Sequence, residues 1–302
     1  MKNIKKISSI FLAFLIILSI IFLNKKETNN TTYYKNLKEL NYNVTYKQAF
    51  PDQNFRYTVL TCIVNNICNE VDEILKESDM SKWINSTKII NEAKFTPEIK
   101  TKENELLNKE DLNKIKMIYF YSESIIRINK ITSFRGIEFL SNLVMFYVNN
   151  STHPEINLSF NPNIEYLKIY GENEYGRACD INIDNTTKLK EFVFDFKLKL
   201  PQNSNLKPLN FNSNLSLKNL QINNCKMPYI NLSNNNLLQE VSLNNNEMNS
   251  FIYGNKLSLK KLSLEDNKIS TLYLSTMPNL EELNIKNNNI GNLDFSIISN
   301  LK

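Results

Sequence analysis

The sequence predicts an α/β solenoid with short parallel strands on its concave face. Extended or 3-10 segments would form the convex backs, and a small helical cap would cover the N-terminal end. Three observations support this prediction. An apolar pattern recurs every 21 residues towards the end of the chain, its central Leu-x-Leu alternates like a half-buried strand, and helical patterns precede the first repeat.

The repeat reads L-x-x-L-x-L-x-x-N/C-x-I and continues with two more apolar positions. LKKLSLEDNKISTLYLSTMPN, residues 259–279, is one complete unit, and LEELNIKNNNI opens the next. Leu262 and Leu264 alternate as a strand requires, and Asn267 turns the chain out of the strand. Leu272 and Leu274 follow too closely for a helix, which predicts an extended or 3-10 back.

The pattern opens about eight units over residues 115–302. Their first apolar residues are Ile115, Leu143, Ile164, Leu189, Leu217, Leu238, Leu259 and Leu280. Because one unit cannot bury its apolar residues alone, neighbouring units stack into a solenoid with a continuous core. Leu301 opens a further unit without a polar closing segment, which suggests end-to-end self-association or a fragment of a larger surface protein.

The periodic motif resembles the leucine-rich repeat, and a 20–29-residue period with this pattern is highly specific for it. The resemblance covers residues 115–302. It implies that the Asn or Cys of each unit is buried, and that the Asn side chain satisfies backbone groups of the turn by both donating and accepting hydrogen bonds.

Residues 45–114 are predicted to form the N-terminal cap. In AFPDQNFRYTVLTCIVNN, Pro51 and Asp52 stand where a helix begins, with Asp52 as its N-cap. Four residues then share one helix face: Phe55, Val59, Cys62 and Ile63. A terminal cap would cover the open end of the solenoid.

The cap also resembles that of internalin-like bacterial proteins. FPDQNFRYTVL looks like the cap helix, LNKEDLNKIKMIYF like the exit into the first strand, and ITSFRGIEFLSNL like the first linker. Residues 66–100 form an insertion that does not align. The Asp/Asn/Gly-rich loop of some relatives is absent, so no calcium site is carried over. The resemblance implies an exported protein that binds other macromolecules.

Residues 1–26 predict either a cleaved signal peptide or an uncleaved membrane anchor. A basic head precedes an apolar run over residues 7–23, which is near the lower limit for a membrane span. The denser positive charge at the N-terminal flank favours an extracytoplasmic location for the rest, either secreted or at the cell surface. Residues 27–44 are polar and are predicted to be a linker.

Charge and cysteine content narrow the function classes. The formal charge is +5, and five lysines before Glu27 account for it, so the remaining chain is nearly neutral and offers no electrostatic case for nucleic acid.

Of the four cysteines, Cys62 and Cys68 are close enough to pair if a turn intervenes. Buried thiols are the interpretation favoured for Cys62, Cys68, Cys179 and Cys225.

The predicted binding surface lies on the first three strands. The residues that flank the inward apolar positions should point to the concave face, and there they are unusually aromatic. Tyrosine dominates binding hot spots because it offers a large amphipathic area, although it also simply fits strands. The candidate binding residues are Tyr119, Tyr121, Met145, Tyr147, Tyr166, Lys168 and Tyr170.

The sequence predicts no enzyme, no cofactor and no metal site. His153 is the only histidine and occupies an apolar position of the repeat, so a structural role is favoured. Glu191 and Glu240 are interpreted as ordinary surface charge rather than a catalytic pair, and Trp83 is assigned to the core. There is no phosphate-binding glycine loop and no zinc signature.

We therefore predict an exported repeat protein that recognises a protein or glycan partner on its concave face, in adhesion or host interaction. The alternative is a structural scaffold of the cell envelope without a discrete ligand.

Overall fold

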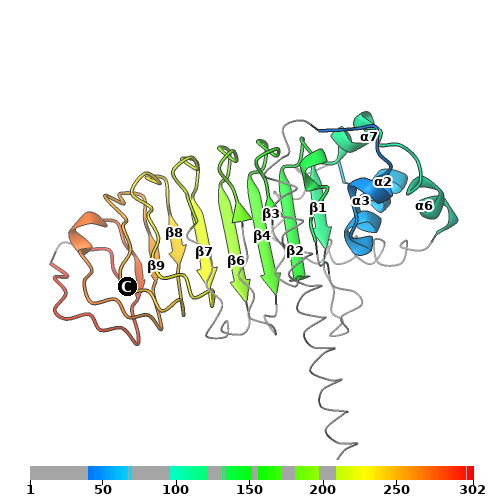
Figure 1. The fold of residues 1–302 in the computed structure, drawn as a ribbon. Helices are drawn as coiled ribbons and strands as arrows, with labels where there is room; N and C mark the ends of the chain where they lie inside the picture. The colour runs from blue at the N-terminus through cyan, green and yellow to red at the C-terminus, as the bar shows by residue number, and fades with distance from the viewer. Residues whose placement is uncertain are drawn as a thin grey trace, which may run out of the picture. The chain divides into compact units, whose positions relative to one another are not determined.

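Eight short parallel strands, one from each predicted repeat, form the central sheet of the computed structural model (Figure 1). The structure describes residues 40–66, 68–69, 96–120, 131, 133–151, 156–171, 181–196, 209–296 and 298–302. The strands are β1 (Met117–Phe120), β2 (Met145–Ser151), β4 (Tyr166–Gly171), β6 (Glu191–Phe196), β7 (Asn219–Asn223), β8 (Glu240–Ser242), β9 (Lys261–Ser263) and β10 (Glu282–Asn284). They pair in chain order, so the predicted solenoid is confirmed.

The apolar positions of the repeat fill the interior. Leu220 of β7 lies opposite Val241 of β8, and Val241 lies opposite Leu262 of β9. These three side chains are 2%, 4% and 1% exposed. Burying an aliphatic side chain of this size contributes roughly 1.5–3 kcal/mol. A column of such side chains therefore makes each repeat depend on its neighbours.

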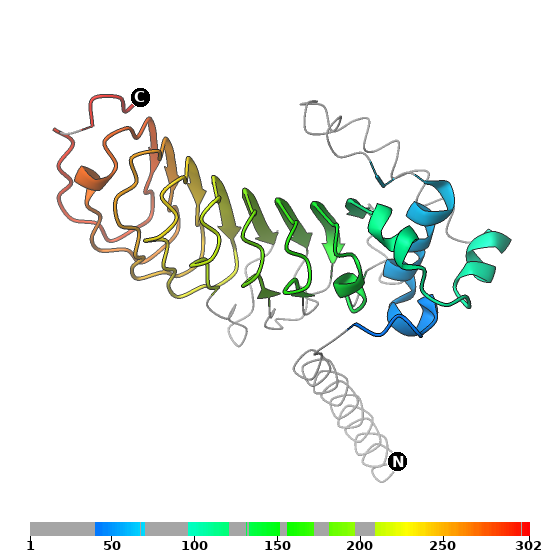
Figure 2. The same cartoon turned by 90° about the horizontal axis from the view of Figure 1, so that it is seen from above.

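Where the structure describes the backs of the repeats, they are extended or 3-10, as predicted. β3 (Ile156–Asn157) pairs in parallel with β5 (Ile181–Asn182), and a single bridge joins Asn231 to Ile252. Short 3-10 turns among the described residues are η2 (Ile137–Phe139) and η3 (Leu274–Thr276). Figure 2 shows the strands on one side of each coil and the backs on the other, with the sheet on the inner, concave side.

A ladder of buried asparagines ties the repeats together at the ends of the strands. The Nδ2 of Asn246 donates to the carbonyl oxygen of Ile222 in the preceding repeat (2.6 Å). Its own backbone N–H donates to Oδ1 of Asn267 in the following repeat (3.1 Å). In the preceding repeat, Cys225 takes the place of the asparagine, and its backbone N–H donates to Oδ1 of Asn246 (3.0 Å). The predicted role of this position is confirmed.

A second ladder of buried polar side chains was not predicted. It lies three residues before the opening apolar residue of several units. Asn161 donates through Nδ2 to the carbonyls of Ile137 and Leu140, both at 2.8 Å. Asn235 likewise donates to the carbonyl of Asn214 (2.9 Å). Asn161 and Asn235 are at most 1% exposed. In the next unit, the position equivalent to Asn235 is occupied by Lys256, which is also 1% exposed.

Within residues 46–114, the part of the chain that the structure describes contains α2 (Tyr46–Ala49), α3 (Gln53–Asn65), α6 (Pro97–Lys102) and α7 (Lys109–Lys114). Asp52 caps α3 as predicted, with Oδ1 accepting from the N–H of Phe55 at 2.9 Å. Val59 and Cys62 of the predicted face are buried, while Ile63 is half-buried.

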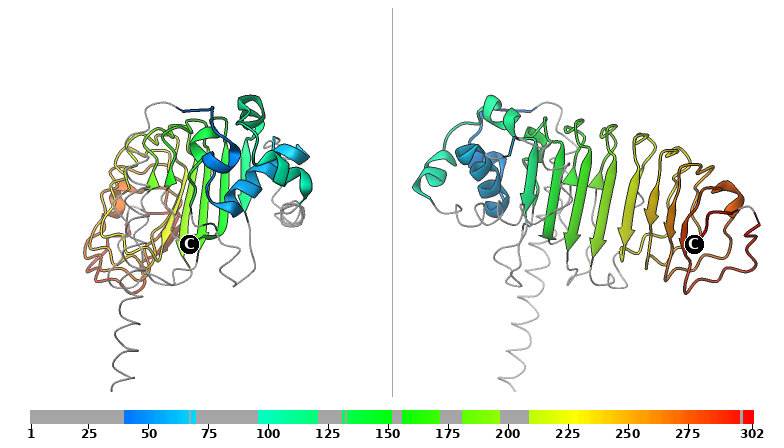
Figure 3. Two further views of the ribbon diagram at one scale, coloured as in Figure 1. Left: turned by 45° about the vertical axis from the view of Figure 1, so that its right-hand side comes forward. Right: turned by 180° about the vertical axis from the view of Figure 1, so that it is seen from behind.

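Aromatic rings join these helices to the first repeats, and Figure 3 shows α3 beside β1 at the end of the sheet. The ring of Phe55 lies edge-on to Phe134 and Phe146, at centroid distances of 5.5 and 6.4 Å. Gly136 has φ +106°, and a side chain there would collide with Phe50, so only glycine suits this position. The sequence predicted the helix face but not these partners.

The cysteine prediction needs correction. Cys62 and Cys68 form a disulfide bond with their Cα atoms 5.2 Å apart, rather than remaining buried thiols. The pairing arises because α3 ends at Asn65 and Asn66 adopts a left-handed conformation (φ 52°), which folds the chain back on itself. Cys225 is a buried thiol, as predicted.

Several predictions concern residues outside the described ranges: the signal peptide or anchor at 1–26, the linker up to residue 39, Trp83, Tyr121, His153 and Cys179. Among the residues that the structure does describe, no helix has the length and apolar character needed to cross a bilayer.

Candidate functional site: the concave face

The outward side chains of the sheet form three rows that cross the strands. The parallel register aligns the first row, Met117, Met145, Tyr166, Glu191, Asn219, Glu240, Lys261 and Glu282. It aligns a second row, Tyr119, Tyr147, Lys168, Val193, Gln221, Ser242, Ser263 and Asn284. A shorter third row holds Tyr170, Asp195 and Asn223. The first strands contribute aromatic side chains and the last strands polar ones.

The aromatic end is more buried than the sequence predicted. Tyr119 and Tyr147 are 3% and 8% exposed, and Met117 and Met145 are similarly buried. The two tyrosine rings stack with centroids 4.5 Å apart. Neighbouring parallel strands are about 4.8 Å apart, so tyrosines in register lie face to face and cover each other. The expected exposure of Tyr119, Met145 and Tyr147 was therefore wrong.

Three of the candidate binding residues, all in β4, remain accessible. Tyr166, Lys168 and Tyr170 are half-buried. The ring of Tyr170 lies 5.5 Å from that of Tyr147, and burial raises the pKa of its hydroxyl to about 12. The Tyr170 hydroxyl therefore stays protonated at neutral pH and can donate a hydrogen bond. Lys168 pairs with Glu191 of the next strand at 2.9 Å.

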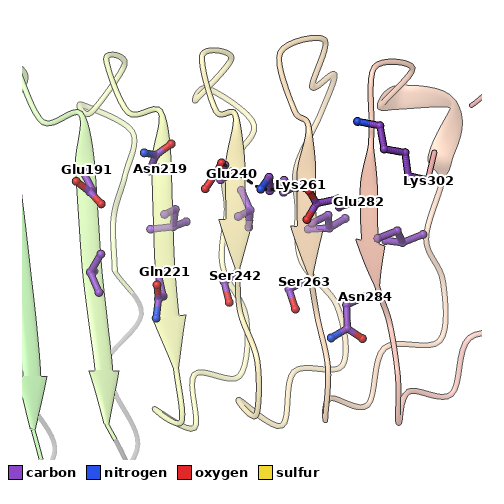
Figure 4. Close-up of a pocket in the computed structure, with 15 residues that line it drawn as sticks. Glu191, Asn219, Gln221, Glu240, Ser242, Lys261, Ser263, Glu282, Asn284 and Lys302 are labelled. Carbon is purple, nitrogen blue, oxygen red and sulfur yellow. Dashed lines mark ion pairs between the residues drawn. The ribbon is translucent and has the colours of Figure 1, made fainter. Parts of the chain in front are cut away.

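A polar hollow of about 480 Å³ lies on the concave face over β6–β10 (Figure 4). Lys261 stands in its wall between two carboxylates, with Nζ 3.1 Å from Glu282 and 3.9 Å from Glu240. The hydrogen bond and charge of Glu282, with the charge of Glu240, raise the pKa of Lys261. Three glutamates and two lysines line the hollow, so its charges nearly cancel and its surface is rich in hydrogen-bonding groups.

Hydrogen bonds between neighbouring repeats fix the side chains around the hollow. The hydroxyl of Ser242 donates to Oδ1 of Asn223 (3.0 Å), and that of Ser263 donates to Oδ1 of Asn244 (2.8 Å). Gln221 donates through Nε2 to an oxygen of the Asp195 carboxylate at 2.6 Å. The sequence carried a signal for this network, because Ser and Asn recur at matched positions 21 residues apart. The predicted site nevertheless lay at the aromatic end alone.

Glu191 and Glu240 both line the hollow, but they lie on β6 and β8 with β7 between them. Each is close to a lysine, Lys168 and Lys261 respectively. Within the described ranges, no group of three or more His, Cys, Asp or Glu side chains is placed to hold a metal ion. The concave face is thus a preorganised surface of hydrogen-bonding and aromatic groups.

Comparison with solved structures supports the fold. The chain is similar to the functional domain of InlJ from Listeria monocytogenes, described as including a cysteine ladder, with a TM-score of 0.55 and 20% identity. The match covers 85% of this chain and 46% of that one, so this chain spans about half the length of the InlJ domain. The ladder of this chain has asparagine at 246, 267 and 288 and cysteine at 225.

Two further Listeria monocytogenes structures resemble the chain more weakly. Internalin C2 gives a TM-score of 0.42 at 16% identity, covering 88% of this chain and 96% of that chain. The internalin InlF gives 0.32 at 14% identity, covering 86% and 83%. No protein-family model matches the sequence, and no curated protein matches it. The fold is that of an internalin-like leucine-rich-repeat protein.

Proposed function

We propose that this leucine-rich-repeat chain is a binding protein that recognises a protein partner on its concave face. The observation that carries the proposal is the continuity of that face, in which the half-buried tyrosines of β4 adjoin the polar hollow over β6–β10. Interfaces of proteins combine aromatic anchors with a polar rim in this way. A repeat sheet fixed by hydrogen bonds also loses little freedom on binding.

The candidate residues divide into two roles. Tyr166, Lys168 and Tyr170 are the proposed contacts, because their side chains are accessible. Tyr119 stacks on Tyr147, and the ring of Tyr147 packs at a tilt against Tyr170 and supports it. Met145 belongs to the same buried cluster. Tyr121 remains a proposed contact on the sequence pattern alone. The nearly neutral hollow favours a partner segment that presents uncharged polar groups.

The binding role predicts a specific loss in a double variant of β4. We expect a partner found on an array of extracellular proteins to bind at least about tenfold more weakly to Tyr166→Ala/Tyr170→Ala, because aromatic hot spots carry much of the binding energy. Affinity would be measured by biolayer interferometry with the purified protein. Circular dichroism would establish that the variant keeps its fold.

The matched control is Tyr229→Ala. Tyr229 is 52% exposed and lies outside the strands of the concave sheet, so its loss removes an accessible tyrosine from another face. Unchanged affinity in the double variant, or an equal loss in the control, would remove the concave face from the proposal. Partners found only on a glycan array, and bound more weakly by the concave double variant, would replace the protein partner with a carbohydrate.

We further propose that the binding domain is exported. The basic and apolar segment at residues 1–26 has the pattern of a signal peptide or anchor. The Cys62–Cys68 disulfide supports the proposal, because disulfides persist mainly in oxidising compartments.

Export predicts that protease treatment of intact cells releases peptides from this chain. We expect mass spectrometry to find peptides from residues 115–295 without lysis, because the repeats would lie outside the cytoplasmic membrane. A cytoplasmic protein measured in the same supernatant controls for leakage. Peptides that appear only after the cells are broken open would argue for an internal scaffold instead.

A further inference from the structure

A second hollow lies on the convex side, between the backs of the last two complete repeats. It has a volume of about 440 Å³ and is bounded by residues 270–275 and 290–294. Leu274 and Ser275 of its lining belong to η3, the orange helical turn towards the C-terminal end of the ribbon in Figure 1. Ligand pockets typically measure about 300–1,000 Å³, so the space suits a small ligand.

The hollow forms where hydrogen bonding between the backs is interrupted. Two repeats earlier, both backbone groups of Ile252 bond to the neighbouring back. Its carbonyl accepts from the N–H of Leu232 (2.6 Å), and its own N–H donates to the carbonyl of Ile230 (2.9 Å). Between the next two backs, the N–H of Tyr273 donates to the side-chain hydroxyl of Tyr253 instead (2.8 Å). Among the described residues, no backbone hydrogen bond joins 270–275 to 290–294. The two backs therefore stand apart and leave polar groups accessible.

Four polar side chains around this hollow have open hydrogen-bonding capacity. Ser270, Thr271, Ser275 and Asn292 are exposed, and within the described part of the chain their side chains make no hydrogen bond. This differs from the concave face, where serines and asparagines bond to one another. Three hydroxyls and one amide can thus donate to and accept from a ligand.

Asp294 supplies the only charge among the described residues that line the hollow. Its Oδ1 accepts from the N–H of Ser296 at 2.9 Å, and the hydrogen bonds from Ser296 lower the pKa of the carboxyl group. The side chain is therefore a carboxylate at neutral pH, held in a turn. A carboxylate accepts strong hydrogen bonds from hydroxyl groups and repels anions.

Tyr273 adds an aromatic surface. The residue is 64% exposed, while its backbone is held by Tyr253. Leu272 and Leu274 on either side are buried and anchor the segment in the core. The exposed ring can pack against an apolar face of a ligand, and its hydroxyl offers a polar tip.

We propose that the convex hollow, bounded by Tyr273 and Asp294, is a binding site for a neutral carbohydrate. A sugar ring presents both an apolar C–H face and several hydroxyls, which matches one exposed aromatic ring surrounded by hydroxyl, amide and carboxylate groups. A peptide would leave the clustered hydroxyls with fewer partners, and an anionic sugar would be repelled by Asp294. This site is separate from the concave surface and does not depend on the protein-binding proposal.

Saturation-transfer difference NMR with the purified chain tests the site. The probes are methyl α-mannoside, methyl β-galactoside, methyl β-glucoside and methyl N-acetyl-β-glucosaminide, each at millimolar concentration. We expect transfer to the ring protons of at least one of them. The apparent affinity should fall at least about tenfold in Tyr273→Ala and several-fold in Asp294→Asn, because these changes remove the aromatic surface and the charged acceptor.

Tyr229→Ala is the matched control, since Tyr229 is also an exposed tyrosine but does not line this hollow. The double variant Tyr166→Ala/Tyr170→Ala distinguishes binding in the convex hollow from binding on the concave face. It should bind the sugar as the unmodified chain does. The proposal is overturned if none of the four sugars shows transfer. It is also overturned if Tyr273→Ala binds like the unmodified chain, or if the concave double variant is the one that loses binding.

Discussion

Replacing Asn267 with alanine is expected to lower the free energy of unfolding by about 4 kcal/mol. Asn267 is 6% exposed, and its side chain bonds to backbone groups of its own and the preceding repeat. Its Nδ2 donates to the carbonyls of Leu243 (2.8 Å) and Leu264 (2.9 Å), and its Oδ1 accepts from the N–H of Asn246 (3.1 Å) and Met248 (3.0 Å). Each buried polar group left unsatisfied costs roughly 1–3 kcal/mol.

Urea unfolding followed by circular dichroism measures this effect. The control is Asn249→Ala, which changes an exposed asparagine in the preceding repeat and should alter stability by less than about 0.5 kcal/mol. A loss below about 1 kcal/mol in Asn267→Ala would show that water or a shifted turn replaces the side chain. The ladder would then be a consequence of the fold rather than a main source of its stability.

Replacing Lys256 with methionine is expected to stabilise the protein by about 3 kcal/mol at pH 7. Lys256 is 1% exposed, and the hydrogen bond from its Nζ to the carbonyl of Asn255 is long at 3.5 Å. Burial lowers the pKa of its amino group from 10.5 to about 8. A difference of one in pKa between the folded and unfolded states corresponds to about 1.4 kcal/mol. Met277 occupies the equivalent position of the next repeat and is fully buried, so methionine suits this position.

The same variant predicts a pH dependence with a definite sign. Because the pKa of Lys256 is lowered in the folded state, the unfolded chain binds more protons between about pH 8 and about pH 10.5. The stability of the unmodified protein should therefore rise with pH across this window relative to Lys256→Met. The advantage of methionine is full below about pH 8 and fades towards about pH 10.5.

Urea titrations of both proteins at several pH values from about 7 to about 10 measure this difference. Lys218→Met is the control, because it removes a lysine whose side chain is exposed. A difference between Lys256→Met and the unmodified chain that stays constant with pH would contradict the prediction. It would mean that the amino group reaches solvent or a negative partner.

The repeat register could be predicted from the sequence because it depends on local periodicity. Leu262 and Leu264 alternate in a strand whatever their neighbours are, and Asn267 follows them at a fixed spacing. Stacking by a constant 21 residues then places each of the later strands beside the next. The helix start at Asp52 is equally local, because it needs only a side-chain acceptor three residues before a free N–H.

The features that define the surfaces were decided by tertiary packing. Tyr119 and Tyr147 are far apart in the chain, and only the register of their strands makes the rings stack and bury each other. Lys256 is buried by the same stacking, although its position in the second ladder could have been recognised by aligning it with Asn235. The two hollows depend on the spacing between whole repeats. The sequence by itself determined which residues lie in each row, whereas the contacts between neighbouring repeats decided which of them a ligand can reach.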